Sequence, residues 1–98
     1  MAASIQFSQK VTVPAHVLFR ELHGESVLLN LNSERYFGLD EVGTRILSVV
    51  ADSASIEEAY QTLAAEYEVQ PEELHSDIQK LLSDLLDQNL IEVVDERK

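Results

Sequence analysis

The sequence lacks cysteine and tryptophan and contains three glycines and two prolines. Without cysteine, the chain can form neither a disulfide framework nor a thiolate-based metal or redox site. The glycines are isolated from one another, which excludes a glycine-rich phosphate-binding loop. No apolar run approaches the ~20 residues that cross a bilayer, and the opening segment does not resemble a signal peptide. These absences favour a cytoplasmic protein that binds no cofactor and enters no membrane.

Basic side chains are scarce as well: 18 acids face 7 bases, and the net charge is −11. Residues 1–39 contain three acids and three bases, so the remaining fifteen acids and four bases carry the whole excess. Nucleic-acid affinity comes largely from cationic side chains that replace counterions. The chain is therefore not expected to bind nucleic acid or an anionic membrane surface.

The residues that are present suit one domain, because 98 residues with 45% hydrophobic content can bury a core. We expect a single domain over residues 1–98 with an ordered core of about residues 11–94. Short β-type runs precede Leu39, and helical periods follow it. This order predicts an α+β, winged-helix-turn-helix-like fold, in which an N-terminal three-stranded antiparallel meander is followed by three helices.

The expected strands are short and joined by tight turns: Val17–Leu22, Ser26–Leu31 and Arg35–Leu39. In the middle strand, Val27, Leu29 and Leu31 share one face. Asp40 is expected to cap a helix that runs to about Val50. The inward residues of this helix are predicted to be Val42, Ile46, Val49 and Val50.

The second helix is predicted to start with a capping box formed by Ser55 and Glu58. Pro71 suits the first position of a third helix that runs to about Gln88. A short final strand is expected at Leu90–Val94. Fraying is expected at residues 1–8 and 95–98.

The third helix has an unusually wide apolar arc of about 140° at 100° per residue. The arc comprises Leu74, Ile78, Leu81, Leu82, Leu85 and Leu86. Either one side of the arc faces the core and the other lines a groove, or a small domain buries a wide face. Asp77 and Asp84 lie beside Leu81, with Lys80 further round, so a groove there would have a charged rim.

Residues that could perform catalysis are sparse. The three histidines, His16, His23 and His75, fall on different elements without metal-ligand spacing, and no nucleophile–base set can be recognised. The sequence therefore predicts neither an enzyme nor a metal site. Two alternatives stay open. Asp52-Ser53-Ala54 superficially fits an acyl or peptidyl carrier protein, and the strand–helix order fits a winged-helix transcriptional regulator.

Two stretches carry a family resemblance: residues 27–31, Val-Leu-Leu-Asn-Leu, and residues 35–46, Arg-Tyr-Phe-Gly-Leu-Asp-Glu-Val-Gly-Thr-Arg-Ile. They resemble the PqqD-like family, which includes the coenzyme PQQ synthesis protein D and the lasso-peptide leader-binding proteins, also called RiPP recognition elements. The resemblance covers about Val17–Val94. It implies a non-catalytic module that binds the leader of a ribosomally made precursor peptide as an added strand on the third strand, against the third helix.

Carried onto this sequence, the resemblance implies a peptide-binding edge and a helical wall. The edge comprises Glu34, Arg35, Tyr36, Phe37 and Gly38; the wall comprises Asp77, Lys80, Leu81, Asp84 and Leu85. Arg35 is expected to pair with a leader carboxylate or a rim acid, and Phe37 to face inward as core or pocket wall. Tyr36 is expected at the surface. Gly38 would permit close backbone approach or a strand-to-helix bend.

The expected partners are the precursor leader peptide and the enzyme that modifies the precursor, either a lasso-type leader protease or a radical SAM enzyme. Asp77 and Asp84 would accept hydrogen bonds from the leader or attract its basic side chains; solvation alone would also explain them. A monomer is expected, with a strand- or domain-swapped dimer as the alternative.

Overall fold

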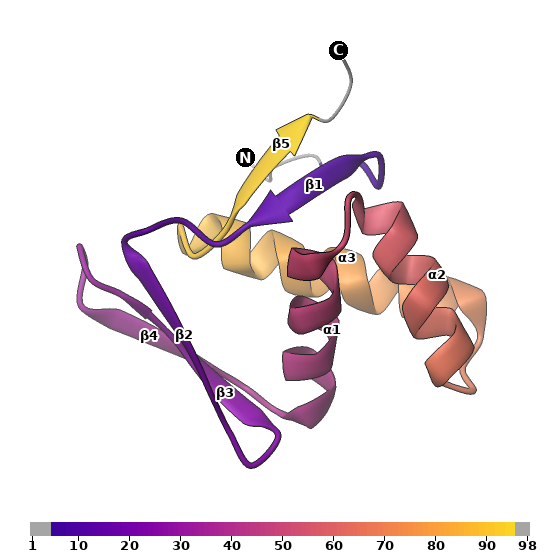
Figure 1. Cartoon of the computed structure of the whole chain (residues 1–98), viewed down its shortest axis with the longest axis horizontal. Helices are drawn as coiled ribbons and strands as arrows, with labels where there is room; N and C mark the ends of the chain where they lie inside the picture. The colour runs from indigo at the N-terminus through magenta and orange to yellow at the C-terminus, as the bar shows by residue number, and fades with distance from the viewer. Residues whose placement is uncertain (1–4, 96–98) are drawn as a thin grey trace.

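The computed structural model describes residues 5–95, and its fold class is the predicted one (Figure 1). A three-stranded antiparallel sheet is followed by three helices, and a second, two-stranded sheet joins the two ends of the described chain. The elements are β1 (Gln9–Thr12), β2 (Val17–Leu22), β3 (Glu25–Asn30), β4 (Arg35–Leu39), α1 (Glu41–Asp52), α2 (Ile56–Glu66), α3 (Pro71–Asp87) and β5 (Glu92–Asp95).

The helix α1 lies between the three-stranded sheet and α2, as Figure 1 shows. The sheet has the order β2-β3-β4, and the two-stranded sheet of β1 and β5 packs against α1 and α2 through β1. Within residues 5–95, no helix is both long enough and apolar enough to span a bilayer.

A two-residue turn, His23-Gly24, joins β2 to β3, and both residues have positive φ angles, 56° and 85°. Positive φ at both central positions defines a type I′ turn, whose twist matches that of the flanking strands. Glycine adopts this backbone without the steric cost that a side chain would add. The predicted turn is therefore confirmed, and its geometry sets the register of the meander.

The inner face of β3 carries fewer apolar residues than the outer face. Leu28 is fully buried there, and the polar Ser26 and Asn30 flank it. Val27 is 43% exposed on the opposite face. Ser26 can be buried because its hydroxyl bonds Thr44 Oγ1 at 2.7 Å. The side-chain Oδ1 of Asn30 likewise accepts hydrogen bonds from the backbone amides of Asn32 and Ser33 in the following turn. The apolar face predicted from Val27 and Leu29 is thus the outer one.

The helix starts agree with the predicted caps. The Asp40 carboxylate accepts from Gly43 N at 2.8 Å, and Ser55 Oγ accepts from Glu58 N at 3.2 Å. The reciprocal bond of the second cap differs by one residue, because Glu58 accepts from Ala54 N. The prediction that Val42 points inward is wrong: it is 50% exposed. Thr44 and Leu47 are buried in α1 instead.

The N-terminal strand β1 was not predicted, and neither was its pairing with β5. Ile5 is 6% exposed, so the core extends further toward the N-terminus than expected. The Phe7 carbonyl accepts from Glu57 N at 2.8 Å at the start of α2. The Phe7 ring stacks on His75 with centroids 4.1 Å apart. The fraying predicted for residues 5–8 is wrong, because Ile5 is buried and Phe7 packs against the core. The fraying predicted for residues 1–4 and 96–98 lies outside the described residues.

Candidate functional site

The outer edge of β4 is the first candidate site. Within residues 5–95, β4 pairs with β3 alone, on one side, and α1 supports it from the inner face. The helix α3 packs mainly against α2. An unpaired strand edge presents backbone donors and acceptors that a further strand can use. The predicted free edge is therefore present.

The register shows which main-chain groups face outward. In a type I′ turn, the residues on either side of the turn are hydrogen-bonded, so Leu22 bonds Glu25. Antiparallel pairs alternate between bonded and non-bonded. It follows that Leu28 bonds Phe37 on the other side of β3, while the amides and carbonyls of Tyr36 and Gly38 point away from β3. No other group in the described chain hydrogen-bonds to these outward groups.

The predicted edge residues occupy different environments. Phe37 is partly buried against the core, and Tyr36 is 76% exposed, as expected. Arg35 is exposed at the start of β4. Glu34 is a correction: it lies in the preceding turn with φ 64°, and its amide already donates to Asn30 O at 2.7 Å. Its main-chain donor is thus not available to a guest strand.

The flank of α3 around Leu81 carries the other predicted residues. Leu81 is partly buried, while Asp77, Lys80 and Asp84 are exposed. Leu85 is a correction: it is 0% exposed and belongs to the core, since it lies about 40° further toward the buried face at 100° per residue. Leu85 can pack beneath the predicted helical wall of the peptide site, but its side chain is not exposed on the surface of that wall.

The opposite flank of α3 is already occupied. His75, which lies about 120° from Leu81 at 100° per residue, contacts Phe7 and Tyr60 of α2. The flank with Leu81 is therefore turned away from α2 and the N-terminal segment. The charged side chains of Asp77, Lys80 and Asp84 are open to solvent, and a role for them as the rim of a peptide-binding groove stays a prediction.

Two hollows mark other parts of the surface, and neither reaches β4 or α3. The first, of about 400 Å³, is lined by Glu21, Gly24, Glu41, Thr44, Arg45, Ser48, Glu66 and Tyr67. The second, of about 300 Å³, is lined by Arg20, Leu22, Glu25, Ser26 and Val27. At the β4 edge, the structure thus offers main-chain groups and a partly buried apolar surface, and the hollows lie elsewhere.

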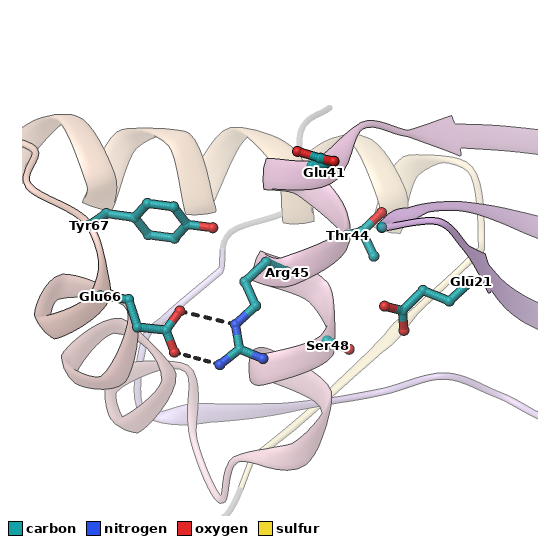
Figure 2. A pocket seen from close by; sticks show the side chains of 8 residues that line it. Glu21, Glu41, Thr44, Arg45, Ser48, Glu66 and Tyr67 are labelled. Carbon is teal, nitrogen blue, oxygen red and sulfur yellow. Dashed lines mark hydrogen bonds and ion pairs between the residues drawn. The ribbon is translucent and has the colours of Figure 1, made fainter.

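The first hollow contains an ion pair between α1 and the end of α2 (Figure 2). Arg45 Nε donates to Glu66 Oε1 at 3.0 Å, and Nη2 donates to Oε2. These bonds lower the pKa of Glu66 and, with the nearby Glu21 as a smaller cause, raise the pKa of Arg45. The lowered pKa means that the pair stabilises the fold at neutral pH and loses this effect as Glu66 is protonated in acid. Because both groups are exposed, the effect is small.

The residues of the first hollow were not predicted from the sequence. Arg45 and Glu66 are 21 positions apart, and Glu21 comes from a third element. Each alone reads as a solvated surface charge, so no spacing rule could have grouped them. Only the packing of α1 against both β2–β3 and α2 brings them together.

Ser53, the residue that suggested a carrier protein, lies at the C-terminal end of α1. Its hydroxyl donates to Val49 O at 2.7 Å at the end of α1. Ser55 and not Ser53 caps the next helix. Among the described residues, no group of three or more metal-ligating side chains is close enough to hold a metal ion.

Alanine substitutions at Gly38 and Gly24, the two glycines near these sites, are expected to change the stability of the fold in opposite directions. An added Cβ at Gly38 meets nothing within 4 Å, so Gly38→Ala is expected to stabilise the fold by about 0.4–1 kcal/mol. Gly24 has φ +85°, a backbone conformation that strains alanine, and an added Cβ would lie 3.2 Å from Glu41 Oε2. Gly24→Ala is therefore expected to lower the free energy of unfolding by about 1–2 kcal/mol. Urea unfolding of both variants measures the difference. A loss of stability in Gly38→Ala would contradict the open space seen there.

The chain is similar to one protein family and to proteins of known structure. The family model of "Coenzyme PQQ synthesis protein D (PqqD)" matches residues 25–91, more than half of the chain. A chain in the solved structure "TbiB1 in Complex with the TbiA(beta) Leader Peptide" is 33% identical, with a TM-score of 0.76 over 83% of this chain and 94% of that one. "Lasso peptide synthetase B1 complexed with the leader peptide" is 23% identical, with a TM-score of 0.76 over 85% and 98%. No curated protein matches the chain.

Proposed function

Because the chain belongs to the family of coenzyme PQQ synthesis protein D, we propose that it binds the leader of a ribosomally synthesised precursor peptide. The observation that carries this proposal is the open edge of β4, with the backbone groups of Tyr36 and Gly38 directed outward. Two structural relatives with the same fold have been solved with leader peptides bound. The leader would add to this edge as a fourth strand.

The side chains of such a guest strand would alternate between two faces. Residues opposite Phe37 would point inward, toward its partly buried ring. In this proposal the flank of α3 with the partly buried Leu81 forms the wall beside them. Residues opposite Tyr36 would lie on the exposed outer face of the sheet. Main-chain hydrogen bonds supply affinity in this mode, and the alternate side chains supply selectivity. Asp77 and Asp84 would favour basic leader side chains beside the inward set.

The module would do no bond chemistry itself and would need no cofactor. Its role is to hold the precursor close to a maturation enzyme, a lasso-type leader protease or a radical SAM enzyme. Joining two binding events in this way raises the effective concentration of the second. Because precursors of this kind leave the ribosome in the cytoplasm, we place the activity there.

Strand addition can be tested with the leader peptide of a precursor that is encoded near the gene of this protein. We expect N-methylation of leader residues to weaken binding strongly at every second position and weakly at the positions between. The reason is that only alternate amides of a guest strand face β4. Each lost bond should reduce affinity by about tenfold, since the methyl group also blocks close approach. Isothermal titration of a full methyl scan measures the pattern.

The scan contains its own control, because neighbouring positions carry the same chemical change. A uniform effect along the leader would mean that the main chain does not pair with the sheet. Complete absence of saturable binding to the unmodified leader would overturn the proposed function itself.

A further inference from the structure

The three-stranded sheet has a second open edge, on β2. Within residues 5–95, β2 pairs with β3 alone. The bonded pairs on this side are Leu22–Glu25, Arg20–Val27 and Leu18–Leu29, by the same alternation from the turn. The amides and carbonyls of Phe19 and Glu21 therefore point away from the sheet. No other group in the described part of the chain hydrogen-bonds to them.

The two hollows flank this edge, one on each face of the sheet. Glu21 shares the inner face with its buried partner Ser26, and it lines the first hollow together with residues of α1 and α2. Arg20 and Leu22 point to the outer face, where they line the second hollow with Val27. A strand added to β2 would thus direct neighbouring side chains into opposite hollows. The β4 edge has neither of these hollows.

The chemistry of the two hollows differs. The inner one contains three carboxylates, Glu21, Glu41 and Glu66, against one guanidinium, Arg45, which Glu66 already binds. In Figure 2, Glu21 and Glu66 lie on opposite sides of Arg45, and Glu41 lies at the start of α1. The outer hollow is bounded by the exposed apolar side chains of Leu22 and Val27, which are 71% and 43% exposed.

We propose that the β2 edge is a second peptide-binding site, which takes an extended segment with a cationic residue between two aliphatic ones. The cation, opposite Glu21, would enter the inner hollow, where Glu21 and Glu41 form no ion pair with any of the described residues. The aliphatic residues, opposite Arg20 and Leu22, would cover the outer hollow. Main-chain bonds to Phe19 and Glu21 would hold the segment in register.

The occupant that fits best is a segment of the maturation enzyme. This assignment rests on the proposed function: a leader on β4 leaves the opposite edge of the same sheet free, so both partners can be held at once. A second copy of the chain fits poorly. If two β2 strands paired, the residues facing the inner hollow would be Val17, Phe19 and Glu21, and none of them is cationic.

The test uses the full chain and two probes, acetyl-Thr-Val-Arg-Val-Thr-amide and its glutamine counterpart, acetyl-Thr-Val-Gln-Val-Thr-amide. Backbone amide shifts in NMR titrations report the site and the affinity. We expect the arginine probe to shift the amides of Phe19 and Glu21 and to bind at least fivefold more tightly than the glutamine probe. Glu21→Gln should remove most of this difference. Glu21→Pro, which removes an outward donor on an edge strand, should weaken both probes.

Three outcomes would overturn the second site: shifts confined to β4, equal affinity for the two probes, or concentration-dependent self-association through β2 without any probe. Leader titration of the same variants separates this inference from the proposed function. Glu21→Gln and Glu21→Pro should leave leader affinity within twofold of the parent chain, since the leader would occupy the other edge. Should Glu21→Pro fail to fold, Glu21→Gln and the probe pair still decide the question.

Discussion

Replacing Leu28 by alanine is expected to be the most destabilising single change in the sheet. Leu28 is 0% exposed, pairs with Phe19 and Phe37, and carries the apolar part of the inner face of β3. Truncating a buried leucine to alanine costs about 2–5 kcal/mol, because transfer energy is lost and a cavity remains. The total stability of a domain this size is about 5–15 kcal/mol.

Thermal unfolding followed by circular dichroism measures this effect. The midpoint should fall by roughly 8–40 °C, at about 4–8 °C for each kcal/mol. Leu22→Ala is the matched control, since Leu22 lies in the same sheet but is 71% exposed, and its change should stay within about 0.5 kcal/mol. Equal midpoints for the two variants would contradict the assignment of the inner face.

Tyr36→Pro is expected to reduce leader affinity at least about tenfold while the fold is retained. The Tyr36 amide points away from β3, so proline removes a donor that only a guest strand would use. The proline ring also obstructs the guest's main chain. A lost hydrogen bond and the clash together should exceed about 1.4 kcal/mol, which is a factor of ten in affinity.

Two neighbouring variants isolate the cause. Tyr36→Ala keeps the amide and removes the exposed ring, so any loss of affinity it causes measures the side chain alone. Phe37→Pro removes a ladder donor to Leu28 and should damage the fold itself. If Tyr36→Pro binds the leader as tightly as Tyr36→Ala, strand addition at β4 would be refuted.

Local signals in the sequence were sufficient for the elements that they predict. Asp40 and Ser55 cap their helices as expected, and Pro71 opens α3. Asn89, with φ 59°, closes α3. These signals act within one turn of helix or one hairpin, where the interacting groups are adjacent in the chain. The free edge of β4 could also be predicted from local order, because β4 is the last of three strands that follow one another in the chain and pair in that order.

The pattern of hydrophobic residues predicted less well which side chains are buried, because burial depends on packing and hydrogen-bond partners as well as on apolar character. Ser26 and Thr44 are buried as a hydrogen-bonded pair, although neither is apolar. Val27 is exposed because its face of the sheet has no covering element among the described residues. Leu85 was expected to line the peptide site and instead packs in the core.

The sequence alone determined the order of β2, β3, β4 and the three helices, the helix caps, and the concentration of negative charge in the helical half. These features depend on residues close together in the chain. The tertiary structure alone decided which face of the meander is buried, how β1 closes on β5, and how Glu21, Arg45 and Glu66 come to share one hollow. Those features depend on distances between elements that are far apart in the chain, and packing sets such distances only when the whole core forms.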